Sequence, residues 1–241
     1  MHRGAIETVL SRILMALSVL AGGGVVHGDA PPTRVGEAYP LGVCAVSGNP
    51  LGEGMVVVVL SDMPSETLEG REVRFCCEGC VARFKADPMA AARKLDEMII
   101  ADQLSVYPDG TCIVMENERM FDPRGPKADR DINRVLGNRL YRFCCKACIR
   151  RFKKAPEPYV TLLDERITQA QSKGYPLSVC VISGRPLGDA PVEVVVANRL
   201  VRTCCKDCAT SVRSNPAPAI AKLGGKEPDD RPAEAEGTEG A

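Results

Sequence analysis

Three copies of one cysteine pattern run through this 241-residue chain and use all twelve of its cysteines. In each copy a single cysteine is followed, after a long gap, by a Cys-Cys-x-x-Cys element. The sets are Cys44, Cys76, Cys77 and Cys80; Cys112, Cys144, Cys145 and Cys148; and Cys180, Cys204, Cys205 and Cys208. The leading cysteines recur every 68 residues, which indicates an array of small modules. One large hydrophobic core is therefore not expected.

Each module carries signals for a hairpin followed by helix. In the first copy the β-branched run 55–60 and the run 72–75 flank a turn at Gly70, and in the second a Gly137-Asn138 turn separates two short apolar runs. After each Cys-Cys-x-x-Cys element the apolar residues change to helical spacing. We predict an α+β fold of three small zinc-finger-like repeats, each with a cysteine knuckle, a β-hairpin and one or two helices. The predicted divisions are a signal peptide 1–28, a linker 29–38, repeats 39–104, 105–173 and 174–224, and a disordered acidic tail 225–241.

The residues after each leading cysteine distinguish the middle repeat from the other two. Ser47-Gly48 follows Cys44, and Ser183-Gly184 follows Cys180. A Ser-Gly turn at this place frees backbone amides to point back at the sulfur, as in a zinc knuckle. The middle repeat has Met115 instead, so its knuckle is predicted to be the least regular.

The first residues of the chain predict export. Arg3 and Arg12 precede an apolar run at 13–20 and then small residues, the order found in signal peptides. The run is shorter than the roughly 20 residues of a membrane span, so a periplasmic or secreted protein without a membrane segment in its mature form is expected. Cleavage after Gly28 would remove His2 and His27, the two histidines of the chain. Catalysis by imidazole and mixed Cys/His metal sites are then excluded, and no enzymatic role is predicted.

The cysteine spacing is suited to a thiophilic metal ion. Adjacent cysteines on a strand point to opposite faces, but where the strand enters a helix either Cys76 with Cys80 or Cys77 with Cys80 can converge with Cys44 on one ion. Sulfur ligands select Zn²⁺, Cu⁺ and similar ions over Mg²⁺ and Ca²⁺. Four thiolates would form a closed structural site, and three would leave a position open for exchange. All twelve cysteines are therefore candidate metal ligands, with Zn²⁺ the expected ion and Cu⁺ or another thiophilic metal the alternative.

The pattern resembles the TRASH and YHS group of small metal-binding domains. The resemblance rests on Cys44, on Cys76-x-x-x-Cys80 and on the following Phe84-x-x-x-Pro88, and it recurs in all three repeats. It implies metal binding and the ligand sets Cys44, Cys76 and Cys80; Cys112, Cys144 and Cys148; and Cys180, Cys204 and Cys208. Many members have Ser where this chain has Cys77, Cys145 and Cys205, which are thus either fourth ligands or spare thiols. The third repeat departs most, with Thr203 and Val212 in place of aromatic residues.

Two other functions fit parts of the sequence. In an oxidising compartment the cysteines could form disulfides, giving a stapled extracytoplasmic interaction scaffold, although adjacent cysteines suit that framework poorly. If the signal peptide is false, the basic stretch of the second repeat favours a nucleic-acid-associated zinc module. The zero formal net charge argues against a nucleic-acid partner. The expected partners are metal ions and a metal-transport or envelope protein.

Overall fold

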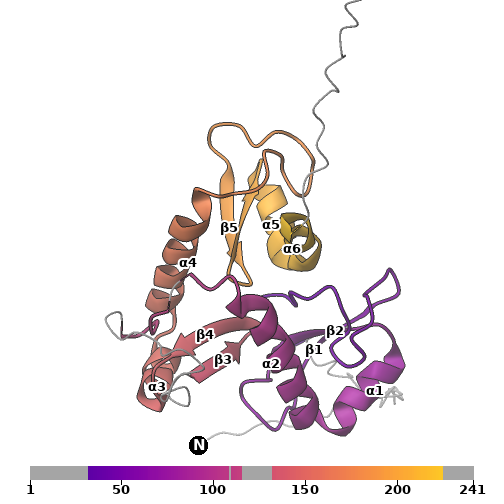
Figure 1. Cartoon of the computed structure of the whole chain (residues 1–241). Coiled ribbons are helices and arrows are strands. Elements are labelled where there is room, and N and C mark those ends of the chain that lie inside the picture. The colour runs from indigo at the N-terminus through magenta and orange to yellow at the C-terminus, as the bar shows by residue number, and fades with distance from the viewer. Residues whose placement is uncertain (1–31, 109, 116–131, 225–241) are drawn as a thin grey trace, which may run out of the picture. The chain divides into compact units, whose positions relative to one another are not determined.

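The computed structural model describes residues 32–108, 110–115 and 132–224 (Figure 1). The predicted signal peptide and acidic tail lie outside these residues, as does the part of the middle knuckle after Met115. Each repeat contributes a two-stranded antiparallel hairpin and then two helices, which confirms the predicted α+β class. The elements are β1 (Val56–Val59), β2 (Glu72–Phe75), α1 (Glu78–Ala86) and α2 (Pro88–Leu104); β3 (Ile132–Leu136), β4 (Arg139–Phe143), α3 (Lys146–Lys154) and α4 (Glu157–Ser172); and β5 (Val192–Val196), β6 (Arg199–Thr203), α5 (Lys206–Ser214) and α6 (Pro216–Gly224).

The second hairpin closes at the predicted Gly137-Asn138 turn, and the third closes in the same way at Ala197 and Asn198. Gly137 and Asn138 have φ of 53° and 67°, and Ala197 and Asn198 have φ of 49° and 59°. Two consecutive residues with positive φ match the right-handed twist of the strands that they join. Glycine and asparagine tolerate this conformation, whereas Ala197 adopts it at a steric cost. In the first hairpin Gly70, with φ of 71°, stands at the place of Asn138.

Each repeat has its own small core beneath the hairpin and helices. In the first, Phe75 of β2 and Phe84 of α1 meet edge to face with ring centroids 5.5 Å apart, and Phe143 and Phe152 do the same at 5.4 Å in the second. Phe84 and Phe152 are buried, as the helical spacing predicts. The third core consists of small aliphatic residues, among them Val212.

The helix starts follow from local chemistry. The Asp87 carboxylate accepts a hydrogen bond of 2.9 Å from the Ala90 amide, and Pro88 occupies the first helical position of α2. In the second repeat Pro156 itself precedes α4. No helix among the described residues is long and apolar enough to cross a membrane.

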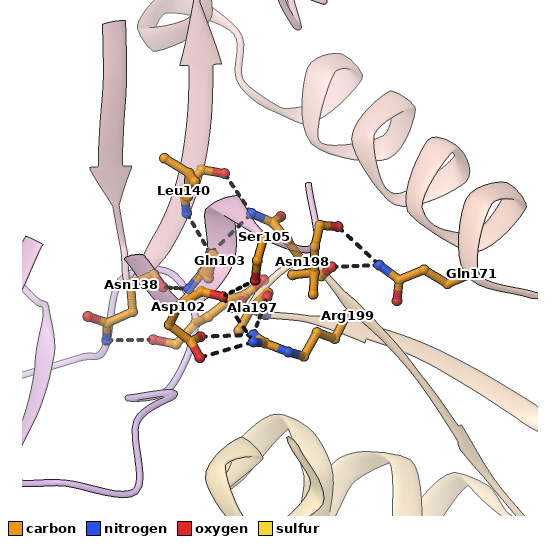
Figure 2. A network of polar contacts seen from close by, with 11 residues as sticks. Asp102, Gln103, Ser105, Asn138, Leu140, Gln171, Ala197, Asn198 and Arg199 are labelled. Carbon is orange, nitrogen blue, oxygen red and sulfur yellow. Dashed lines mark hydrogen bonds and ion pairs between the residues drawn. The ribbon is translucent and has the colours of Figure 1, made fainter. Parts of the chain in front are cut away.

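Polar side chains join each repeat to the next (Figure 2). Gln103, near the end of α2, donates to the Asn138 carbonyl at 3.0 Å and accepts from the Leu140 amide at 2.8 Å. Gln171 of α4 makes the same pair of bonds to the Asn198 carbonyl and the Leu200 amide, at 3.0 and 2.8 Å. A glutamine from one repeat thus caps the hairpin turn of the following repeat at both junctions.

The segment before the first repeat, assigned from the sequence to a linker, packs against two hairpin turns. The Val35 amide donates to the Gly70 carbonyl at 2.7 Å, and the Glu37 amide donates to the Gly137 carbonyl at 2.8 Å. Gly36 approaches Gly137 so closely that a Cβ on either residue would collide with the backbone of the other. Ala38 is fully buried. These contacts tie residues 35–38 to the first and second repeats.

Candidate metal centre

The structure gathers nine cysteines into three triads. In each, the leading cysteine meets the first and last cysteines of the Cys-Cys-x-x-Cys element, and all three sulfur atoms lie within 4.8 Å of one another. The triads are Cys44, Cys76 and Cys80; Cys112, Cys144 and Cys148; and Cys180, Cys204 and Cys208. Two members of each triad are buried and the middle one is partly exposed. Each site therefore lies at the protein surface with one sulfur facing solvent.

All twelve cysteines are free thiols in this structure. Within the triads the Sγ atoms of Cys76 and Cys80 are 3.6 Å apart, as are those of Cys144 and Cys148, and those of Cys204 and Cys208 are 3.9 Å apart. A disulfide requires about 2.05 Å, whereas ligands around one tetrahedral zinc ion, at about 2.3 Å from the metal, are separated by roughly 3.8 Å. The observed spacing is close to that of ligands around one ion, so each triad could hold a metal.

The junction between strand and helix places the second and third cysteines of each triad. β2 ends at Phe75, Cys76 follows, and Cys77 in extended conformation is the N-cap of α1. Cys80 then lies in the first turn of the helix and is buried against the core. Cys145 and Cys205 occupy the same N-cap position in the other repeats. The alternation of the extended backbone separates Cys76 from Cys77, so the four-residue pairing of Cys76 with Cys80 forms the triad.

The leading cysteine of the triad lies in a knuckle whose backbone amides and hydroxyl point at its sulfur. In the first repeat the Cys44 amide donates to the Asn49 carbonyl at 2.7 Å, and the Gly48 amide donates to the Cys44 carbonyl at 3.0 Å. Gly48 has φ of 72°, which explains the glycine. Ser47 Oγ accepts from the Asn49 amide at 3.3 Å and lies 3.5 Å from Cys76 Sγ. The predicted Ser-Gly turn thus has a second role, which sequence reasoning missed, because its hydroxyl touches the thiols.

The knuckle makes its cysteine acidic in the first and third repeats. Burial opposes ionisation of Cys44, but the Ser47 hydroxyl and the amides of Ser47 and Val46 outweigh it and lower the pKa to about 6. The pKa of Cys180 is lowered to about 6 in the same way, against burial, by the Ser183 amide and hydroxyl. Both thiols are therefore mainly thiolates at neutral pH.

The other triad members hold their protons more tightly. The Ser47 hydroxyl lowers the pKa of Cys76, but the neighbouring thiols, Cys80 foremost, raise it to about 11. Burial is the main cause that raises the pKa of Cys144 to about 11. Three sulfur atoms this close cannot all be ionised without a cation between them. A metal ion that replaces these protons removes the repulsion.

Three of the predicted ligands stay outside the triads. Cys77 Sγ lies 3.9 Å from Cys76 Sγ, and Cys145 Sγ lies 3.6 Å from Cys148 Sγ, at the solvent side of their clusters. The backbone amide of Cys80 is the main cause that lowers the pKa of Cys77, as the amide of Cys208 does for Cys205. The Cys145–Cys148 separation equals the Cys144–Cys148 separation of 3.6 Å, so the N-cap thiols stay candidates for a fourth ligand.

A basic side chain supports the first site. The Arg83 guanidinium donates to Cys80 Sγ at 2.9 Å from the next turn of α1. A cation there offsets the excess negative charge of three thiolates around a divalent ion. Its sequence signal is its position three residues after Cys80, on the same face of the helix.

The chain matches no protein-family model, and no curated protein or solved structure shows a significant match to it. The resemblance to the TRASH and YHS group consequently rests on the sequence motif alone. The geometry supports the coarser description of three cysteine-rich modules with thiols at metal-binding distance.

Proposed function

We propose that this protein binds up to three thiophilic metal ions, one in each cysteine triad, and that it handles metal without catalysing a reaction. The observation that carries the proposal is the threefold recurrence of three sulfur atoms within 4.8 Å. Soft sulfur donors select ions such as Zn²⁺ and Cu⁺, and three protein ligands leave one coordination position open.

The placement of the triads favours exchange of metal over a purely structural role. A structural zinc site is normally closed by four protein ligands. Here the middle cysteine of each triad is partly exposed, and a further thiol at the helix N-cap lies beside the site. An incoming ligand can approach the metal from the solvent side, and the N-cap thiol provides an intermediate ligand during transfer. Delivery to, or uptake from, a metal-transport or envelope protein fits this arrangement.

Location outside the cytoplasm is part of the same proposal. Its support is the signal-like sequence at 1–28. In such a compartment, bound metal would also keep the thiols of each triad from oxidising to disulfides, because coordination occupies their lone pairs.

Native mass spectrometry of the protein, purified from its own compartment without added metal, tests the proposal. We expect two or three bound metal ions that are lost on denaturation in acid, and one ion fewer in each of the variants Cys76→Ser, Cys144→Ser and Cys204→Ser. A metal-free protein with a denatured mass about twelve hydrogens below that of the reduced chain would replace this function with a disulfide scaffold.

A further inference from the structure

The third residue after the leading cysteine differs between the second knuckle and the other two. Three residues after the leading cysteine stand Ser47 in the first repeat, Met115 in the second and Ser183 in the third. The two serine hydroxyls lie 3.5 and 3.3 Å from a sulfur of their own triads, those of Cys76 and Cys204. Position 115 is therefore the place from which a knuckle side chain reaches the metal cluster.

Met115 follows Cys112 by three residues, and its sulfur contacts an arginine of the helix that carries Cys148. Its Sδ lies 3.8 Å from Nη1 of Arg151, which follows Cys148 by three residues on α3. Arg83 has the same position in the first repeat, and its guanidinium contacts the ligand sulfur of Cys80. The guanidinium that contacts a cysteine sulfur in the first repeat thus has a counterpart in the second that contacts a thioether. Met115 is 40% exposed, so its side chain is accessible from solvent.

The charge around the second site also differs. Helix α3, which carries Cys148, has five basic and no acidic residues in nine positions. Helices α1 and α5 each have two basic residues and one acidic residue in the same length. Three thiolates carry a net charge of −1 with a divalent ion and −2 with a monovalent ion. The helix is only about 14 Å long, so all five basic side chains lie close to Cys148. Their positive charge therefore favours the complex of three thiolates with a monovalent ion, which is the more negative of the two.

We infer that Met115 completes the second triad as a neutral thioether ligand and that this site takes a soft monovalent ion, Cu⁺, while the sites of the first and third repeats take Zn²⁺. Thioether and thiolate sulfur together favour Cu⁺, whereas Zn²⁺ is bound by thiolate, imidazole and carboxylate ligands. The loss of the knuckle serine and the gain of a thioether act in the same direction. This inference rests on the proposed function, because it assigns different ions to triads already proposed to bind metal.

A competition titration of the full chain tests it. The protein is labelled with ¹³C-methyl-methionine and loaded with Zn²⁺, and Cu⁺ is then added from a buffered chelator complex. A zinc dye measures the released zinc, and NMR follows the methionine methyl signals. We expect the first equivalent of Cu⁺ to displace one zinc ion and to shift the Met115 methyl signal, which is assigned by its disappearance in Met115→Leu. In Cys144→Ser this first step is lost, and in Cys76→Ser it remains.

Two exchanges of the knuckle residue provide matched controls. Met115→Ser gives the second knuckle the serine of the other two and is expected to lower its affinity for Cu⁺ by at least about tenfold, since losing even a residue that only supports a ligand costs about that much. Ser47→Met is expected to raise the Cu⁺ preference of the first repeat. If three zinc ions bind but Cu⁺ displaces them without preference and the Met115 signal does not move, the inference is overturned and the proposed function stands. If no metal binds to any triad, both are overturned.

Discussion

Arg71 of the first repeat donates from Nε to Oδ1 of Asn138 in the turn of the second hairpin, at 2.8 Å. Arg139 makes the same bond, also at 2.8 Å, to Asn198 in the turn of the third hairpin. Both asparagines are fully buried, and their amide groups also donate to backbone carbonyls of the preceding repeat, at 2.8 Å to Glu72 and 2.9 Å to Leu140. One polar junction is thus built twice.

The junction continues into the helices. Arg71 is paired with Asp96 of α2 at 2.7 Å, and Arg139 with Asp164 of α4 at 2.6 Å. In the third repeat Arg199 pairs with Asp102, a residue of α2 in the first repeat, at 2.8 Å. The last helix, α6, has only nine residues compared with 17 in α2. In the third repeat the short helix α6 therefore does not supply the partner of the hairpin arginine, and Asp102 of the first repeat pairs with Arg199 instead.

Replacement of Asn138 is expected to be costly. Asn138→Ala removes the acceptor of Arg71 Nε and leaves buried donors and acceptors without partners, which should destabilise the metal-loaded protein by about 3 kcal/mol. It also places alanine at φ of 67°, at a further cost of about 1 kcal/mol. Chemical denaturation measures the free energy of unfolding of each variant. Asn138→Gly should lose the stability of the hydrogen bonds but not pay the cost of the positive φ, so it separates the two effects. Equal stabilities of the two variants would contradict a role for the backbone conformation.

The two adjacent cysteines of each element are expected to behave differently. Cys76→Ser removes a triad ligand and should abolish metal binding at the first repeat, because a neutral hydroxyl replaces a soft thiolate. Cys77→Ser should leave the equilibrium stoichiometry unchanged and slow the transfer of metal to a competing chelator, since Cys77 lies beside the cluster. Metal counting by mass spectrometry and stopped-flow transfer to the chelator distinguish the variants. Loss of the ion in Cys77→Ser would make that thiol a fourth ligand.

Arg83 is expected to tune the first site without binding the ion. In Arg83→Gln the charge-assisted contact to Cys80 Sγ is lost, and the affinity for Zn²⁺ should fall about tenfold, as for other residues that support a ligand. Competition with a zinc chelator measures this change. Arg93→Gln, a change on the exposed part of α2, is the matched control and should leave the affinity unaltered. An equal fall in both variants would assign the effect to overall charge.

The sequence was sufficient to predict the hairpins, the helices that follow them and the grouping by repeat. Local signals determine these elements: Asn138 and Asn198 suit turns with positive φ, and Phe84 and Phe152 fall at helical spacing. It left open which adjacent cysteine joins each cluster, because that depends on whether the extended backbone runs through Cys76 into Cys77.

The junctions between repeats were not predicted from the sequence. Gln103 and Gln171 are 68 residues apart, the same spacing as the leading cysteines, but a buried glutamine on a helix is not distinguished from an exposed one by composition. Its function depends on a turn 35 residues further along the chain in the first case, where Gln103 meets the Asn138 carbonyl. Contacts of this kind come from tertiary packing, which periodicity within one element does not describe.

Metal binding at the first repeat should depend on pH in two stages. Above about pH 6 Cys44 is a thiolate before metal arrives, so the proton released on binding comes from thiols such as Cys76, whose pKa is about 11. Below pH 6 Cys44 also binds a proton, and the logarithm of the affinity should fall more steeply with decreasing pH, by about one additional unit per pH unit. Chelator competition from pH 5 to 8, on a chain carrying Cys144→Ser and Cys204→Ser, isolates this site.

Two serine variants serve as test and control. In Ser47→Ala the change of slope should move to higher pH, because the hydroxyl that favours the Cys44 thiolate is gone. Ser183→Ala alters only the third knuckle and should leave the change of slope near pH 6. A slope that stays constant across this range, or that shifts equally in both serine variants, would show that the knuckle hydroxyl does not control the ionisation of Cys44.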